Sequence, residues 1–148
     1  MSNRDAMMWQ SATAILFGTM ALFMVSYEWP VSLVVLSMFA IGYSAVRHFL
    51  LTYDEKDIIF FSAIWGVLFA EIGWLAHFWS FGYVIPGLEV LKIPQVTIII
   101  LLLSFLGERT YRSWKKHKSI EISDVLAPAL LVIALVCTIL IFFNSVTI

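Results

Sequence analysis

The sequence predicts an all-α protein, a polytopic bundle of five transmembrane helices. Of its 148 residues, 61% are hydrophobic and only 13% are charged, and the mean hydropathy is +0.95. A soluble domain carries roughly 25% charged residues, so this composition is typical of a chain solvated by lipid. Long apolar runs follow one another along the chain, and most basic residues fall in the connections that share one side. We expect a single integral membrane domain over residues 1–148 and no soluble domain.

The first predicted span covers residues 6–27, a run that no charged residue interrupts. It is longer than the roughly 7–15 apolar residues of a signal peptide, and no small-residue cleavage motif follows it. We therefore expect it to be retained. The second span covers residues 30–51 and begins at Pro30, whose missing N–H is tolerated in the first turn of a helix.

The third predicted span covers residues 57–81, after a polar turn that offers several helix-capping side chains. The next segment, Gly82 to Pro94, is too interrupted by Pro and Gly for a spanning helix. It is also too apolar for a water-exposed loop. We expect this segment to lie at the membrane interface.

The fourth predicted span covers residues 94–111, and its apolar part ends near Gly107. That part is short for a span, since crossing takes about 20 apolar residues, so we expect the helix to continue beyond the bilayer. The fifth span covers residues 124–144. Asp124 is a candidate cap for it, and Pro128 falls early enough to bend the first turns without breaking the helix.

Orientation follows from the basic residues, because loops rich in Lys and Arg stay on the cytoplasmic side. With five spans, Lys92 alone lies on the outer side. The other eight share the cytoplasmic side: Arg4, Arg47, Lys56, Arg109, Arg112, Lys115, Lys116 and Lys118. The N-terminus is then cytoplasmic and the C-terminus is on the outer side. We expect a multi-pass protein of the cell membrane.

Glu71 is the most unusual residue within a predicted span. It lies roughly 20 Å along a helix that starts near Ile58, close to the bilayer midplane. A carboxylate there should be protonated, paired or in a wet cavity. It is therefore a candidate proton or cation site, with a structural alternative in which a neutral carboxyl is hydrogen-bonded to a polar group of another helix. Four residues are possible partners: Tyr43, Gln95, Thr97 and Ser104.

His77 is the second ionisable residue of that span and completes the candidate intramembrane site. It follows Glu71 by six residues, which is about 9 Å along a helix and roughly 240° around it. A straight helix therefore keeps the two side chains apart. A hydrogen-bonded histidine near the outer interface is the favoured interpretation.

A stripe of small residues runs along the same predicted helix. Its members recur at spacings of three and four: Ala63, Gly66, Ala70 and Gly73. Small residues let helix backbones approach closely in lipid. We expect the stripe to pack against another helix of the same chain, with contact to another subunit as the alternative.

A basic cluster follows the fourth apolar run. Its cations are candidate contacts for anionic lipid head groups, each contributing up to about 1 kcal/mol near the surface. The simpler interpretation is that they only set the orientation. The cluster comprises Arg109, Arg112, Lys115, Lys116 and Lys118.

No catalytic motif was found, and no nucleotide-binding or paired-cysteine motif either. The single cysteine, Cys137, cannot form an internal disulfide. Three histidines at two depths do not make a metal or haem site. We expect no metal, no cofactor, no nucleic-acid partner and no enzymatic activity.

Two functions remain open from the sequence. The first is a non-enzymatic subunit or scaffold of a membrane assembly, whose partner is another membrane protein or a further copy of the chain. The alternative is an oligomeric transporter or channel, linked to protons or cations through Glu71. A lipid-modifying enzyme is disfavoured because Glu71, His77 and Arg109 fall at three different depths.

Overall fold

The computed structural model describes residues 3–53, 55–79, 81–85 and 87–142, and its framework in these ranges is five α-helices and one two-stranded sheet. The helical class predicted from the sequence is confirmed. The elements are α1 (Asn3–Val25), α2 (Val31–Leu50), α3 (Ile58–Ala76), β1 (Gly82–Ile85), β2 (Leu88–Pro94), α4 (Gln95–His117) and α5 (Ile122–Phe142).

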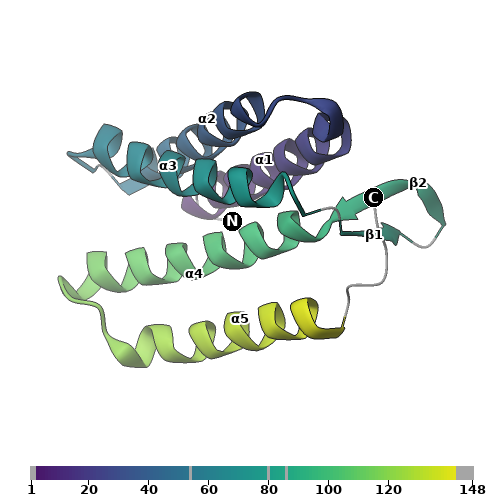
Figure 1. The fold of residues 1–148 in the computed structure, drawn as a ribbon. Coiled ribbons are helices and arrows are strands. Elements are labelled where there is room, and N and C mark those ends of the chain that lie inside the picture. The colour runs from purple at the N-terminus through teal and green to yellow at the C-terminus, as the bar shows by residue number, and fades with distance from the viewer. Residues whose placement is uncertain (1–2, 54, 80, 86, 143–148) are drawn as a thin grey trace.

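The helices lie alongside one another and alternate in direction (Figure 1). In this view α4 lies between the group formed by α1, α2 and α3 and the outlying α5, and the β1–β2 hairpin projects at the end opposite the α4–α5 connection. Within the described residues, α1, α2, α3 and α5 are long and apolar enough to cross a membrane. Helix α4 is not among them, because its charged second half begins at Glu108.

The third helix is shorter than the sequence predicts. It ends at Ala76 and not near residue 81. The chain turns at this point, and the Phe81 carbonyl oxygen accepts a hydrogen bond of 2.8 Å from the Gln95 backbone N–H. This bond joins Phe81, at the end of the segment that follows α3, to the first residue of α4. The backbone beyond Ala76 therefore does not continue the α3 helix.

The segment after α3 forms an antiparallel hairpin, a structure that the sequence did not predict. Gly82 pairs with Pro94, and Val84 pairs with Lys92. Gly87 has a φ of +86°, which is in the left-handed region that favours glycine. The same Pro and Gly residues that exclude a spanning helix therefore suit the ends and the turn of a hairpin.

Helices α2 and α3 pack closely. A Cβ atom at Gly42 would lie 2.4 Å from Cγ of Phe69, and one at Gly73 would lie 2.6 Å from Cγ of Met38. Phe69 and Met38 are both buried. Glycine at these positions lets the two backbones approach and lets each side chain fill the space that a Cβ would occupy.

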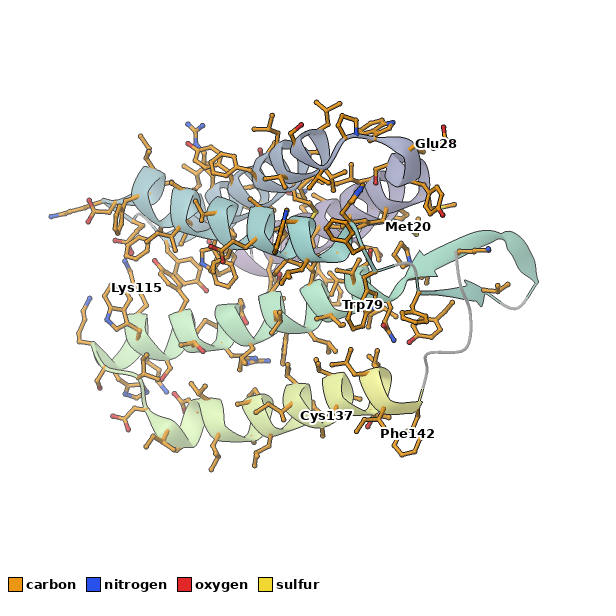
Figure 2. All side chains as sticks on the ribbon, viewed as in Figure 1. Met20, Glu28, Trp79, Lys115, Cys137 and Phe142 are labelled. Atoms are coloured by element: carbon orange, nitrogen blue, oxygen red, sulfur yellow. The ribbon has the colours of Figure 1, made fainter. Side chains whose placement is uncertain are left out.

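Helix α5 packs against α4 and is mostly exposed (Figure 1). Val132 is its only buried side chain among the described residues. Cys137 is free and exposed on α5 (Figure 2). In a membrane, α5 therefore presents most of its surface to lipid or to a partner.

Candidate functional site

Glu71 lies on the exposed face of α3, among apolar side chains. The residues three and four positions before it, Val67 and Leu68, are 50% and 41% exposed, and those three and four positions after it, Trp74 and Leu75, are 55% and 61% exposed. Residues at these spacings surround a helical position on its own face. Glu71 is thus the one carboxylate at the centre of an apolar surface, which we call the Glu71 face.

The depth of Glu71 differs from the sequence expectation. Because α3 ends at Ala76, the carboxylate lies roughly 20 Å from the start of the helix and about 8 Å from its end. It is therefore inside the apolar segment, in the half of α3 that leads to the hairpin.

Glu71 has no hydrogen bond or ion pair to any residue in the described part of the chain. Of the partners suggested by the sequence, Gln95 and Thr97 are buried and bonded elsewhere. His77 caps the end of α3, where its ring packs edge-on against Phe78 with 5.2 Å between ring centroids. The structure does not bring Glu71 and His77 together.

The small-residue stripe packs within the chain. Gly66 is buried, and a Cβ there would lie 2.8 Å from the ring of Phe39 on α2. Gly73 is also buried against α2, whereas Ala63 and Ala70 are half-buried. The stripe and the Glu71 face are therefore different sides of α3.

The basic cluster is tied to carboxylates at the end of the bundle opposite the hairpin. The Lys115 ammonium donates to Glu55 Oε2 at 2.7 Å, and the Tyr111 hydroxyl donates to the same oxygen at 2.5 Å. These hydrogen bonds, with that from Lys115 contributing most, hold the pKa of Glu55 below its usual value of 4.5. They connect the loop before α3 to the end of α4.

The other cations of the cluster divide into two groups. Arg112 forms an ion pair with Glu108, and Arg109 lies 3.8 Å from the same carboxylate. Lys116 and Lys118 are exposed, and Lys118 lies over the Trp114 ring. Within the described ranges, Lys116 and Lys118 are the members of the cluster that are not tied to a carboxylate.

A neutral hydrogen-bond network lies at the hairpin end. Gln95, which is fully buried, accepts a hydrogen bond of 2.6 Å from the Trp79 indole N–H. Its amide nitrogen donates to the Tyr83 hydroxyl at 2.7 Å and to the Ile139 carbonyl at 3.1 Å. Figure 2 shows Trp79 close to the start of α4. This network joins the end of α3, the hairpin, α4 and α5.

A cavity of about 460 Å³ lies at the opposite end, among α1, α2, α3 and α4. Its wall is mainly apolar, with Asp5, Ser11 and Glu108 among its polar groups. No local pattern identified the cavity, because its residues come from four helices.

The histidines lie apart from one another, each with its own neighbours. His48 is hydrogen-bonded to the Gln10 side chain at 3.0 Å, and His117 lies 3.3 Å from Asp124. Across the described ranges, no three His, Cys, Asp or Glu side chains are grouped so that they would hold a metal ion.

The sequence matches no known family model, and neither a curated protein nor a solved structure shows significant similarity to the chain. The fold itself defines the class: a helical protein with four helices that are long and apolar enough to cross a membrane.

Proposed function

We propose that the chain is an integral membrane protein of five spans, with its N-terminus in the cytoplasm and its C-terminus outside. The alternating helix directions support this arrangement (Figure 1). Lys115 and Glu28 mark opposite ends of the bundle in Figure 2, and the basic cluster belongs to the Lys115 end. Loops rich in Lys and Arg stay cytoplasmic, so the Lys115 end is the cytoplasmic one and the cell membrane is the expected location.

The position of α4 supports its role as a further span beside the four apolar helices. It lies between α5 and the other helices (Figure 1), and α5 has the highest hydropathy of the four candidate spans. A bilayer that contains α1 and α5, both of which pack against α4, also contains the apolar first half of α4. The second half, from Glu108 to His117, reaches the head groups, where Lys116 and Lys118 meet anionic lipid.

Within this membrane topology, the function we propose is that of a non-enzymatic subunit of a membrane assembly. The observation that carries the proposal is the exposed Glu71 at the centre of an apolar face. Against lipid alone, this carboxyl group would have no hydrogen-bond partner. Insertion scales give about 2.5–3.5 kcal/mol for an acidic residue such as Asp at the centre of a span.

A partner helix that covers the Glu71 face removes this penalty. It offers the carboxyl group a hydrogen-bond donor or a cation, and it packs against Trp74 and Leu75, which are 55% and 61% exposed. The partner is another membrane protein or a second copy of this chain. In either case the stripe at Gly66 and Gly73 stays within the subunit, against α2.

An oligomeric proton- or cation-linked transporter or channel is the second candidate. The same exposure of Glu71 favours it, because a carboxylate on the outside of one subunit lines a path only where subunits meet. Glu71 lines neither of the two cavities at the cytoplasmic end, so a conduit of this kind would form between copies of the chain.

Replacing Glu71 tests both candidates. For the subunit, Glu71→Leu should remove most of the protein from its assembly, whereas Glu71→Gln, which still forms hydrogen bonds, should retain part of it. Association is measured by size-exclusion chromatography with light scattering after extraction in mild detergent. The matched control is Glu28→Gln, because Glu28 is an exposed carboxylate outside the spans.

The transporter predicts a different pattern. Glu71→Gln should abolish ion flux in proteoliposomes while the oligomer stays intact. The subunit proposal is overturned if the wild-type chain is extracted as a lone monomer without a co-purifying partner. It is also overturned if Glu71→Leu associates as the wild type does.

A further inference from the structure

The cavity at the cytoplasmic end has the size and chemistry of a ligand site. Its volume of about 460 Å³ falls within the roughly 300–1,000 Å³ typical of small-molecule sites. Apolar side chains such as Ile15, Trp65 and Leu101 line its deeper part. About one turn closer to the hairpin, a buried 3.0 Å hydrogen bond between Thr19 and Thr97 joins α1 to α4. The cavity lies on the other side of this bond from the hairpin.

The cytoplasmic rim of the cavity is polar. Glu108 and Arg112 line it from α4, and Asp5 lines it from α1. Arg112 also donates to the sulfur of Met8 at 3.4 Å, which ties the two helices together at the rim. The cavity is therefore apolar toward the membrane and charged toward the cytoplasm.

Two polar side chains of the wall are buried. The Ser11 hydroxyl belongs to a residue that is 7% exposed, and the Glu108 side chain is 10% exposed. Ser11 Oγ makes no hydrogen bond within the described part of the chain. Glu108 Oε1 is paired with Arg112, and a carboxylate can accept further hydrogen bonds beside such a pair. An unsatisfied buried polar atom is destabilising by about 1–3 kcal/mol, so a bound molecule that donates a hydrogen bond to Ser11 would be favoured.

The cavity also opens toward lipid. Trp9 and Phe105, which are 62% and 39% exposed, line it together with buried residues such as Ile15. They stand on α1 and α4, the two helices that carry the polar rim. A molecule already dissolved in the bilayer therefore has a lateral route between these helices.

We propose that the cavity binds a membrane lipid whose head group donates hydrogen bonds. The lipid chain fills the apolar part, and an ammonium or hydroxyl group of the head group donates to Glu108 and Ser11. An ionised carboxylate only accepts hydrogen bonds, and a serine hydroxyl can accept as well as donate, so a donor in the head group suits both side chains. This site is independent of the Glu71 face, which is the exposed face of α3 and does not line the cavity.

Native mass spectrometry of the full-length protein in mild detergent tests the proposal. The probes are phosphatidylethanolamine, phosphatidylglycerol and phosphatidylcholine with identical chains. The ethanolamine head group carries an ammonium, the glycerol head group carries hydroxyls, and the choline head group donates no N–H or O–H bond. We expect one retained lipid per chain, with about a tenfold preference over phosphatidylcholine, the factor that one charge-assisted hydrogen bond supplies.

The first two probes distinguish the source of the donor. Retention of phosphatidylethanolamine alone assigns an ammonium, and retention of phosphatidylglycerol alone assigns a hydroxyl. Retention of both supports the shared chemistry. Equal retention of all three lipids overturns the proposal, because it indicates only non-specific lipid at the protein surface.

Two variants of α1 locate the lipid. Ala12→Phe fills the cavity, which Ala12 lines, and should abolish lipid retention. The control is Ala21→Phe, because Ala21 is exposed on the same helix. Ser11→Ala, which removes one acceptor and adds no bulk, should lower the head-group preference severalfold, and it keeps the test decisive if Ala12→Phe fails to fold. Unchanged preference in Ser11→Ala, or a retained lipid in folded Ala12→Phe, overturns the proposal.

Discussion

The α2–α3 pair and helix α4 are attached to the bundle in different ways. Helices α2 and α3 are held by close packing, because glycines on each helix make room for large side chains of the other. A Cβ atom at Gly42, for example, would lie 2.4 Å from Cγ of Phe69. Helix α4 is attached by polar bonds at its two ends, through Gln95 at the hairpin end and through Lys115 at the opposite end.

The difference reflects where each interface lies. In lipid, helices gain no hydrophobic free energy by associating, so close van der Waals packing and hydrogen bonds are the remaining attractions. The α2–α3 interface runs through the apolar part of the bundle and uses packing. Helix α4 makes its hydrogen bonds and ion pair near the two ends of the bundle, and the cavity lies at the end opposite the hairpin.

The largest expected effect is in the α2–α3 interface. Gly42→Ala places a Cβ 2.4 Å from Cγ and 2.7 Å from Cβ of Phe69. These atoms are close to the Phe69 backbone and cannot rotate away, so we expect a destabilisation of about 3 kcal/mol, the upper part of the overpacking range. The free energy of unfolding in mixed micelles measures it.

Gly18→Ala is the matched control for this substitution. A Cβ at Gly18 would lie 3.4 Å from the Ile41 side chain, and we expect a change within about 0.5 kcal/mol. Equal effects of the two alanines would show that close α2–α3 packing does not determine stability.

An intermediate effect is expected at the hairpin end of α4. Gln95→Leu removes the hydrogen bonds to Trp79, Tyr83 and Ile139, all of which are part-buried. We expect a loss of about 2 kcal/mol and faster proteolysis of the hairpin. Gln10→Leu, at an exposed glutamine that bonds only to His48 among the described residues, should cost less than about 0.5 kcal/mol. Similar losses would argue against the network as the attachment of α4.

The smallest effect is expected at the Lys115 end of the bundle and depends on pH. Because the pKa of Glu55 is lowered in the folded protein, its contribution is complete above the usual value of 4.5. It is lost as the pH falls through the folded-state pKa. Partly exposed ion pairs contribute at most about 1 kcal/mol to the free energy of unfolding, so we expect the loss at low pH to be no larger than this.

Unfolding of Glu55→Gln measured between neutral and acidic pH tests this contribution. The variant should be less stable than the wild type at neutral pH, and the difference should shrink at low pH. Asp57→Asn in the same loop, where Asp57 is exposed, is the control and should show no such pH-dependent difference. A Glu55→Gln difference that stays constant with pH would contradict the assignment.

Much of the fold was predictable because helices in lipid satisfy their own backbone hydrogen bonds. Apolar length therefore identified the helices, and the Pro and Gly residues after α3 identified the break. The hairpin was missed because its pairing depends on contacts between strands, such as Val84 with Lys92. The early end of α3 was missed because the next residues, through Trp79, are apolar enough to continue a helix.

The sequence alone determined the helical class of the chain, the number and order of its helices and the presence of one carboxylate, Glu71, inside the apolar third helix, because these depend on composition and on local periodicity. Only the tertiary structure decided that Glu71 faces outward and that Gly66 faces α2. It also decided that Ser11 and Glu108 share a cavity. Which side of a helix is covered depends on how the helices pack. Because apolar residues occur on all sides of α3, the periodicity of its sequence does not indicate which side faces the bundle.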